Sequence, residues 1–291
     1  MRRHRFWTLS LLALFSAAAA SEAAAPSKPN ILFIFADDCG IDSFSPYGSD
    51  FGKSLTPNIA KLAEGGTRFD RCYASPLCGP SRCLIMTGRY PFRTGGLTNQ
   101  TAGNANHKSE PALARILNDA GYATGMAGKW RQMSDSPGDW GFKEFITDPT
   151  AGGWYWKNSY IRNGQEVTTD KEIYYPDVCS DFAVDFIKRH KDQPFYFYLS
   201  EHLIHGPILR TPDSKPGATA AEMYIDNLKY LDKTVGKMVK ALDDFGLREK
   251  TLIVFSSDNG TATVGYQPAH DPEKNVGKIG GRAVNGHKGQ V

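Results

Sequence analysis

The sequence has 291 residues, of which 34 are Lys or Arg and 31 are Asp or Glu, and its formal net charge is +3 at neutral pH. This small excess gives no electrostatic case for a nucleic-acid partner, because proteins that bind nucleic acids concentrate basic residues. Hydrophobic residues make up 41% of the chain, which is enough for one large domain or for two smaller ones.

The first 25 residues are typical of a secretory signal peptide. Three arginines within the first five residues precede an apolar run at 6–20, and small residues follow. The run has about 15 residues, whereas a membrane span needs roughly 20, so a membrane anchor is the weaker interpretation. We therefore expect an exported protein, periplasmic or secreted, without membrane attachment after cleavage at Ala20 or Ala25. Cleavage at Ala20 leaves equal numbers of acidic and basic residues.

Short apolar runs alternate with amphipathic segments along the rest of the chain. Asn30–Ala36 is continuously apolar, which is typical of a strand buried on both faces of a parallel sheet, and the pattern recurs at 194–200 and 251–257. Helices are predicted between these runs, at 57–64, 110–120, 178–190 and 220–245. An irregular or hairpin excursion is predicted at 154–167. This alternation predicts an α/β fold, with a mostly parallel sheet sandwiched by helices.

Polar residues follow two of the predicted strands directly. Asp37 and Asp38 follow the first strand, and Asp258 and Asn259 follow the strand at 251–257. Ligands gather beyond the carboxyl ends of parallel strands, and carboxylates that meet there repel one another unless a cation neutralises them. Oxygen donors alone favour Ca²⁺ or Mg²⁺ over zinc. An Asp-Asp pair alone is more often part of a turn or a helix cap. The matching Asp-Asn pair after a second strand favours a metal site.

The most specific pattern is LCGPSRCLIMTGR, at 77–89. Six of its positions match the signature of the formylglycine-dependent sulfatases, which the chain therefore resembles: Cys78, Pro80, Ser81, Arg82, Thr87 and Gly88. The fold of that family is similar to alkaline phosphatase. The alternative, an ordinary thiol before a helix, leaves the other five matches unexplained. Pro80 is expected to begin a helix, which places Cys78 at its N-terminus.

The resemblance covers nearly the whole chain after the signal peptide, and it implies a set of site residues. It implies conversion of Cys78 to formylglycine by a maturation system, which is thus an expected partner. The implied ligands of Ca²⁺, or less favourably Mg²⁺, are Asp37, Asp38, Asp258, Asn259 and the converted residue 78. The implied sulfate-binding and catalytic residues are Cys78, Arg82, Lys129, Lys288 and His205, with His205 protonating the departing oxygen.

The chain departs from the family pattern in two places. Arg131 follows Lys129 and Trp130 where many family members have a histidine, and an arginine cannot titrate near neutral pH. The sequence also ends at Val291, whereas family members continue into a C-terminal subdomain. Residues 26–291 are therefore expected to form a sulfatase catalytic domain that is incomplete at its C-terminal end.

The five cysteines leave the disulfide pattern open. If Cys78 is converted, the other four form two disulfides in one of three connectivities or remain thiols: Cys39, Cys72, Cys83 and Cys179.

The expected reaction is hydrolysis of a sulfate ester on a small molecule or a carbohydrate. The organic part of the substrate is not predicted, because it depends on loops such as 95–108 and 152–164. Two alternatives remain: a phosphate or phosphonate ester hydrolase of the same superfamily, and a non-catalytic binder of sulfated glycans.

Overall fold

The structure, a computed structural model, describes residues 28–47, 55–130, 133–149, 155–262, 278–279, 282–283 and 288. The predicted signal peptide, Arg131 and Trp154 lie outside these residues. Within the described ranges, no helix is both long enough and apolar enough to cross a membrane.

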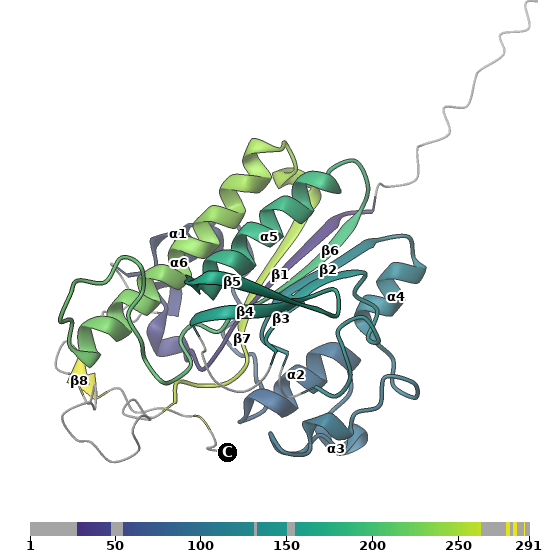
Figure 1. The fold of residues 1–291 in the computed structure, drawn as a ribbon, viewed down its shortest axis with the longest axis horizontal. Helices are drawn as coiled ribbons and strands as arrows, with labels where there is room; N and C mark the ends of the chain where they lie inside the picture. The colour runs from purple at the N-terminus through teal and green to yellow at the C-terminus, as the bar shows by residue number, and fades with distance from the viewer. Residues whose placement is uncertain are drawn as a thin grey trace, which may run out of the picture.

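A seven-stranded sheet forms the centre of the molecule, in the order β5-β4-β3-β2-β6-β1-β7 (Figure 1). Its strands are β1 (Asn30–Ala36), β2 (Ala123–Gly128), β3 (Glu144–Thr147), β4 (Trp156–Arg162), β5 (Gln165–Tyr174), β6 (Phe195–Ser200) and β7 (Thr251–Ser257). Five neighbouring strands are parallel, namely β3, β2, β6, β1 and β7. Strand β4 runs antiparallel to both β3 and β5. A separate two-stranded ribbon pairs β8 (Lys278–Ile279) with β9 (Arg282–Ala283).

Helices cover both faces of the sheet (Figure 1). They are α1 (Pro57–Glu64), α2 (Cys78–Thr87), α3 (Pro91–Thr94), α4 (Leu113–Asp119), α5 (Tyr175–Arg189) and α6 (Ala220–Asp244), with 3-10 turns at Ile41–Ser43, Ser45–Tyr47, Ala102–Asn104 and Arg248–Lys250. Successive side chains of a strand point to opposite faces. Accordingly, Leu32 and Ile34 of β1 pack with α1, α5 and α6, whereas Phe33 and Phe35 pack with α2 and α4.

The predicted parallel α/β architecture is confirmed, and several details are corrected. Strands β2 and β3 were not predicted, because the short, small-residue sequence ATGMAG and the four-residue β3 carry little periodicity. Helix α2 begins at Cys78, two residues before Pro80, since proline is tolerated throughout the first turn of a helix. The hairpin of β4 and β5 occupies the predicted excursion.

The burial of β7 also differs from the prediction. Its residues are mostly half-buried, and Leu252 is 54% exposed. No strand among the described residues pairs with its outer side, so β7 is an edge strand there. Helices α4 and α5 are shifted by up to three residues from the predicted bounds 110–120 and 178–190.

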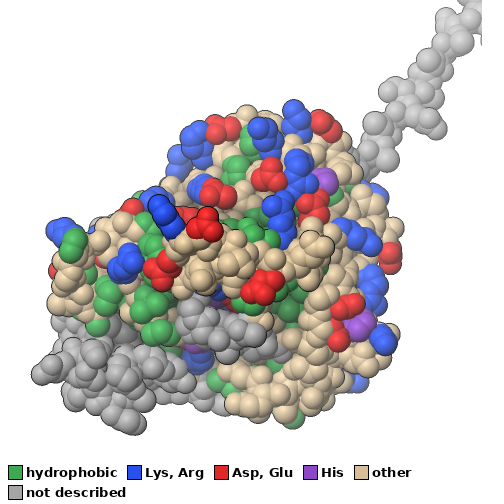
Figure 2. Space-filling view, viewed as in Figure 1, with side chains coloured by type: hydrophobic (Ala, Val, Ile, Leu, Met, Phe, Trp, Pro, Cys, Tyr) green, Lys and Arg blue, Asp and Glu red, His purple; other side chains and the backbone are tan. Residues whose placement is uncertain are grey.

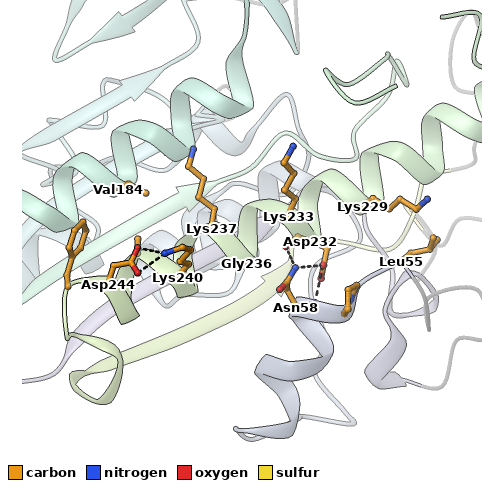
Figure 3. Close-up of a pocket in the computed structure, with 13 residues that line it drawn as sticks. Leu55, Asn58, Val184, Lys229, Asp232, Lys233, Gly236, Lys237, Lys240 and Asp244 are labelled. Atoms are coloured by element: carbon orange, nitrogen blue, oxygen red, sulfur yellow. Dashed lines mark hydrogen bonds and ion pairs between the residues drawn. The ribbon is translucent and has the colours of Figure 1, made fainter. Parts of the chain in front are cut away.

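Helix α6 has a groove beside it, of about 880 Å³, between residues of α1 and α5 (Figure 3). Asp232 accepts hydrogen bonds from the backbone amides of Asn58 and Ile59, so it caps the N-terminus of α1. None of the predicted site residues lines this groove. Acidic and basic side chains are interspersed on the face in Figure 2, which agrees with the balanced composition.

No disulfide joins the five cysteines in the structure, and only Cys72 is exposed among them. Neither of the two disulfides that the sequence left open is formed.

Glu201, directly after β6, gives a prediction about stability. Its carboxyl group is fully buried, and burial raises its pKa to about 8, although the backbone of His202 favours the ionised form. The neutral form therefore stabilises the fold below pH 4.5, and this contribution is lost as the pH rises through 8. We expect Glu201→Gln to increase the free energy of unfolding at pH 9 by about 3 kcal/mol and to leave it nearly unchanged at pH 4.

Urea unfolding at both pH values measures this effect. Glu249→Gln, at an exposed position, is the control and should change stability at neither pH. An equal effect of Glu201→Gln at pH 4 and pH 9 would contradict the assignment.

Candidate active site

The register of the sheet brings the two predicted polar clusters together. Strands β1 and β7 are paired from Asn30 with Thr251 to Ala36 with Ser257, so Asp37 and Asp258 follow at the same level. The backbone amide of Asp38 donates to Asp258 Oδ1 at 3.0 Å, and Asn259 Nδ2 donates to Asp38 Oδ1 at 2.8 Å. Four residues from distant parts of the chain thus meet at the carboxyl edge, and all four are buried.

Cys78 lies beside this acidic cluster at the first position of α2. Its Sγ is 3.5 Å from Asp37 Oδ1 and 3.4 Å from Asp38 Oδ1. Burial raises the pKa of the Cys78 thiol, and the carboxylates of Asp37 and Asp258 raise it further. Since the thiolate is the nucleophilic form of cysteine, an unmodified Cys78 is a poor nucleophile here.

Arg82 and Lys129 supply positive charge beneath the carboxylates. Arg82 Nη2 donates to Asp258 Oδ2 at 3.0 Å, and Lys129 Nζ forms an ion pair with Asp37. Burial opposes the ionisation of Asp37, but Lys129, His205 and Arg82 outweigh it and hold the pKa of Asp37 well below its usual range. Asp258 differs, because burial and the charge of Asp37 raise its pKa.

Backbone geometry places Lys129 at the end of β2. Gly128 has a φ of 108°, and a Cβ there would collide with the carbonyl oxygen of Ser200. The Lys129 amide donates to that oxygen at 2.8 Å, and Ser200 Oγ donates to the Lys129 carbonyl at 2.7 Å. Arg82 Nη1 donates to the same Oγ at 2.5 Å. Ser200, which was not predicted, therefore links the two cationic residues.

His205 and Lys288 both lie close to the carboxylate of Asp38. His205 Nε2 is 3.6 Å from Asp38 Oδ2, and Lys288 Nζ is 2.6 Å from Asp38 Oδ1. His205 Nδ1 lies 2.5 Å from the Gly206 carbonyl, and Tyr155 donates to the His205 carbonyl. Burial lowers the pKa of His205, and the charges of Asp37 and Asp38 oppose this effect. Burial opposes the charge of Lys288, but Asp38 raises its pKa overall.

The donor set fits a hard divalent cation. Ligand atoms of Asp37, Asp38, Cys78 and His205 lie within 4.8 Å of one another. Asn259 Oδ1 is buried without a hydrogen-bond partner, as expected of an oxygen kept for a ligand. Carboxylate and amide oxygens suit Ca²⁺ or Mg²⁺, whereas the Cys78 thiol does not. This group of four residues differs from the predicted set of metal ligands. The predicted set contains Asp258 and Asn259 but not His205.

The comparison with family models decides the classification. The Sulfatase model matches residues 29–290. The chain belongs to the sulfatase family. It is 32% identical to arylsulfatase A of Bos taurus, over 89% of this chain and 56% of that protein. It is also 32% identical to N-acetylgalactosamine-6-sulfatase of Canis lupus familiaris, over 87% of this chain and 54% of that protein. The chain thus spans a little over half the length of these curated relatives.

Solved structures agree with the sulfatase fold. The complex of Ps i-CgsB with k-i-k-neocarrahexaose has a TM-score of 0.71 at 31% identity, covering 84% of this chain and 61% of that one. The phosphonate monoester hydrolase of Agrobacterium radiobacter has a TM-score of 0.54 at 18% identity, so it shares the fold alone.

Two aromatic side chains at the start of the β4–β5 hairpin, Tyr155 and Trp156, contact other parts of the protein. Tyr155 is completely buried, and its hydroxyl holds the loop that carries His205. Trp156 donates to the Arg210 carbonyl at 2.8 Å, and the Arg210 guanidinium lies 4.0 Å from the centre of its ring. Both side chains are therefore engaged within the protein.

Proposed function

We propose that this sulfatase-family chain carries the catalytic site of a hydrolase that cleaves a sulfate ester into inorganic sulfate and an alcohol or phenol. The observation that carries the proposal is the position of Cys78, at the start of α2 between the carboxylates of Asp37 and Asp38 and close to Arg82. The high pKa of its thiol supports conversion to formylglycine, since the thiol itself is a poor nucleophile.

Residue 78, once matured, supplies an oxygen nucleophile toward sulfur and a second hydroxyl whose deprotonation expels the sulfate. A bound divalent cation would neutralise the acidic cluster and the sulfate oxygens. Asp37, Asp38, Asp258 and Asn259 would hold that cation, with the matured residue 78 as a further oxygen ligand.

The surrounding cations bind the transferred group. Lys129 pairs with Asp37 and Lys288 pairs with Asp38, and their ammonium groups would contact sulfuryl oxygens and offset the charge that develops there. Arg82 is fully buried and holds Asp258, so it would fix the charge distribution beneath residue 78. His205, with Nδ1 turned toward the Gly206 carbonyl, keeps Nε2 for proton transfer to the leaving oxygen.

We also propose that the substrate is a sulfated carbohydrate or a sulfated small molecule and that the protein is exported after removal of its signal peptide. Sulfatases that act on carbohydrates among its relatives support the first proposal, and the arginine-led apolar run supports the second. A formylglycine-generating system is the required partner.

Turnover of matched substrates tests the reaction class. We expect the full chain, produced with a maturation system, to cleave an aryl sulfate at least about 100-fold faster, in kcat/KM, than the corresponding aryl phosphate or phosphonate, since each tenfold corresponds to about 1.4 kcal/mol. Preference for phosphate or phosphonate would favour the related hydrolase class. Cleavage of neither, with tight binding of sulfated glycans, would favour the non-catalytic binder.

Removal of the cation gives a second prediction. Chelation should lower activity and the melting temperature together, and excess Ca²⁺ should restore both, because a ligand of the native state stabilises it by mass action. Saturation at 100 times Kd corresponds to about 2.7 kcal/mol. Asp38→Asn should weaken the response to Ca²⁺, whereas Asp192→Asn, at an exposed turn, should leave it unchanged. Stoichiometric zinc without calcium or magnesium would contradict the assignment.

A further inference from the structure

The loop at 95–104 packs directly against the first turn of α2. The N-cap residue of this helix, Leu77, provides no side-chain hydrogen bond to the free amides of the first turn. Asn99 provides one from the loop, because its Oδ1 accepts from the Gly79 amide at 2.8 Å. Asn99, which lies 20 residues downstream, therefore caps the N-terminus of α2 through the backbone amide of Gly79, the residue after Cys78.

The loop and the helix are so close that neither Gly79 nor Gly96 could carry a side chain without displacing a neighbour. A Cβ on Gly79 would lie 2.8 Å from Ala102 Cβ and 3.1 Å from Asn99 Cα. A Cβ on Gly96 would lie 3.0 Å from Cys83 Sγ, on the next turn of the helix. Ala102 is itself completely buried, at the start of the 3-10 turn Ala102–Asn104. Two glycines therefore let the loop lie against the first two turns of α2.

From this contact we infer that Asn99 is a positioning residue for residue 78. It fixes the first turn of α2 through the Gly79 amide, and thereby holds the side chain of residue 78 between Asp37 and Asp38. The inference deepens the proposed function and rests on it for the catalytic consequence. Asn99 acts on the backbone next to the nucleophile, so its loss should affect the rate of the chemical step more than substrate binding.

Three variants of the full chain test the inference. Asn99→Ala removes the acceptor, whereas Asn99→Asp keeps an oxygen at the same distance from the backbone. Asn106→Ala is the control, because Asn106 Oδ1 accepts from the Lys108 amide in the same connection, away from α2. With matured protein, we expect Asn99→Ala to lower kcat about tenfold with KM within about twofold. Asn99→Asp should retain kcat within about threefold, and Asn106→Ala should match the wild type.

A second measurement does not need sulfatase activity. In protein produced without the maturation system, Cys78 is a buried thiol, and its alkylation by iodoacetamide can be followed by peptide mass spectrometry. We expect Asn99→Ala to speed alkylation of Cys78 and hydrogen exchange of the Gly79 amide at least about fivefold, and Asn99→Asp to change neither.

The two measurements separate failure of the inference from failure of the proposed function. If the wild type cleaves no sulfate ester, the proposed function is wrong. Alkylation of Cys78 and hydrogen exchange of the Gly79 amide still show whether Asn99 positions residue 78. Alkylation and exchange within twofold of the wild type in Asn99→Ala would overturn the inference, as would equal loss of kcat in Asn99→Ala and Asn99→Asp.

Discussion

Replacement of Cys78 by alanine should reduce sulfate ester cleavage by at least about 1000-fold while the protein still folds. The expected loss is large because residue 78 is the proposed nucleophile, and alanine has no oxygen to replace it. The fold should persist, since only one sulfur atom is removed from the edge of the core. Initial rates with an aryl sulfate and a urea unfolding curve measure the two effects separately.

Cys83 is the matched control for this prediction. It lies on the same helix and is equally buried, but its Sγ contacts Thr94 Oγ1 at 3.1 Å and is not near the acidic cluster. We expect Cys83→Ala to cost about 1 kcal/mol of stability through lost packing and to keep more than about a third of the activity. Equal losses of activity in both variants would assign Cys78 a structural role only.

Replacement of Arg82 by methionine should have the largest effect on stability. Arg82 is fully buried, and its guanidinium pairs with Asp258 at 3.0 Å and lies 3.7 Å from Asp37. Methionine fills part of the volume but removes the ion pair of Asp258, whereas Asp37 still pairs with Lys129. Loss of one member of a buried ion pair costs about 3–5 kcal/mol, so we expect a decrease of that size in the free energy of unfolding, together with loss of activity.

Arg68→Met is the control, because Arg68 forms an ion pair with Asp70 at 2.8 Å at the surface. An exposed pair contributes about 0–1 kcal/mol, so this variant should remain stable and active. Adding Asp258→Asn to Arg82→Met should recover part of the stability, because it removes a buried charge, but no activity. If Arg82→Met and Arg68→Met were equally stable, Arg82 would not compensate the carboxylates as described.

The sequence predicted strands β1, β6 and β7 and the residues at their ends more completely than it predicted the rest of the fold. Asn30–Ala36 and Thr251–Ser257 were predicted with their observed bounds, because continuous apolar runs that end in acidic residues are distinctive. Strand β2 was missed, since Gly125 and Gly128 are selected by close contacts with Phe186, Phe197 and Ser200 and not by strand propensity. Only the three-dimensional packing reveals such a requirement.

The sequence also predicted only some of the residues of the candidate site. Cys78, Arg82, Lys129, His205 and Lys288 were found through motifs and their order along the chain, and the structure places all of them around Asp37 and Asp38. Ser200 and Asn99 were not found, because a lone serine at a strand end and an asparagine in a glycine-rich loop carry no sequence signal. Their roles follow from hydrogen bonds to backbone groups that are 71 and 20 residues away.

The mass of the peptide that contains residue 78 shows directly whether Cys78 has been converted to formylglycine. The full chain should be produced with a formylglycine-generating system, purified in active form and digested, and the peptide should be measured alongside the rate of sulfate ester cleavage. We expect the thiol sulfur to be replaced by an aldehyde oxygen and the specific activity to rise in proportion to the converted fraction. Full activity in protein that carries only unmodified cysteine at position 78 would contradict the formylglycine mechanism.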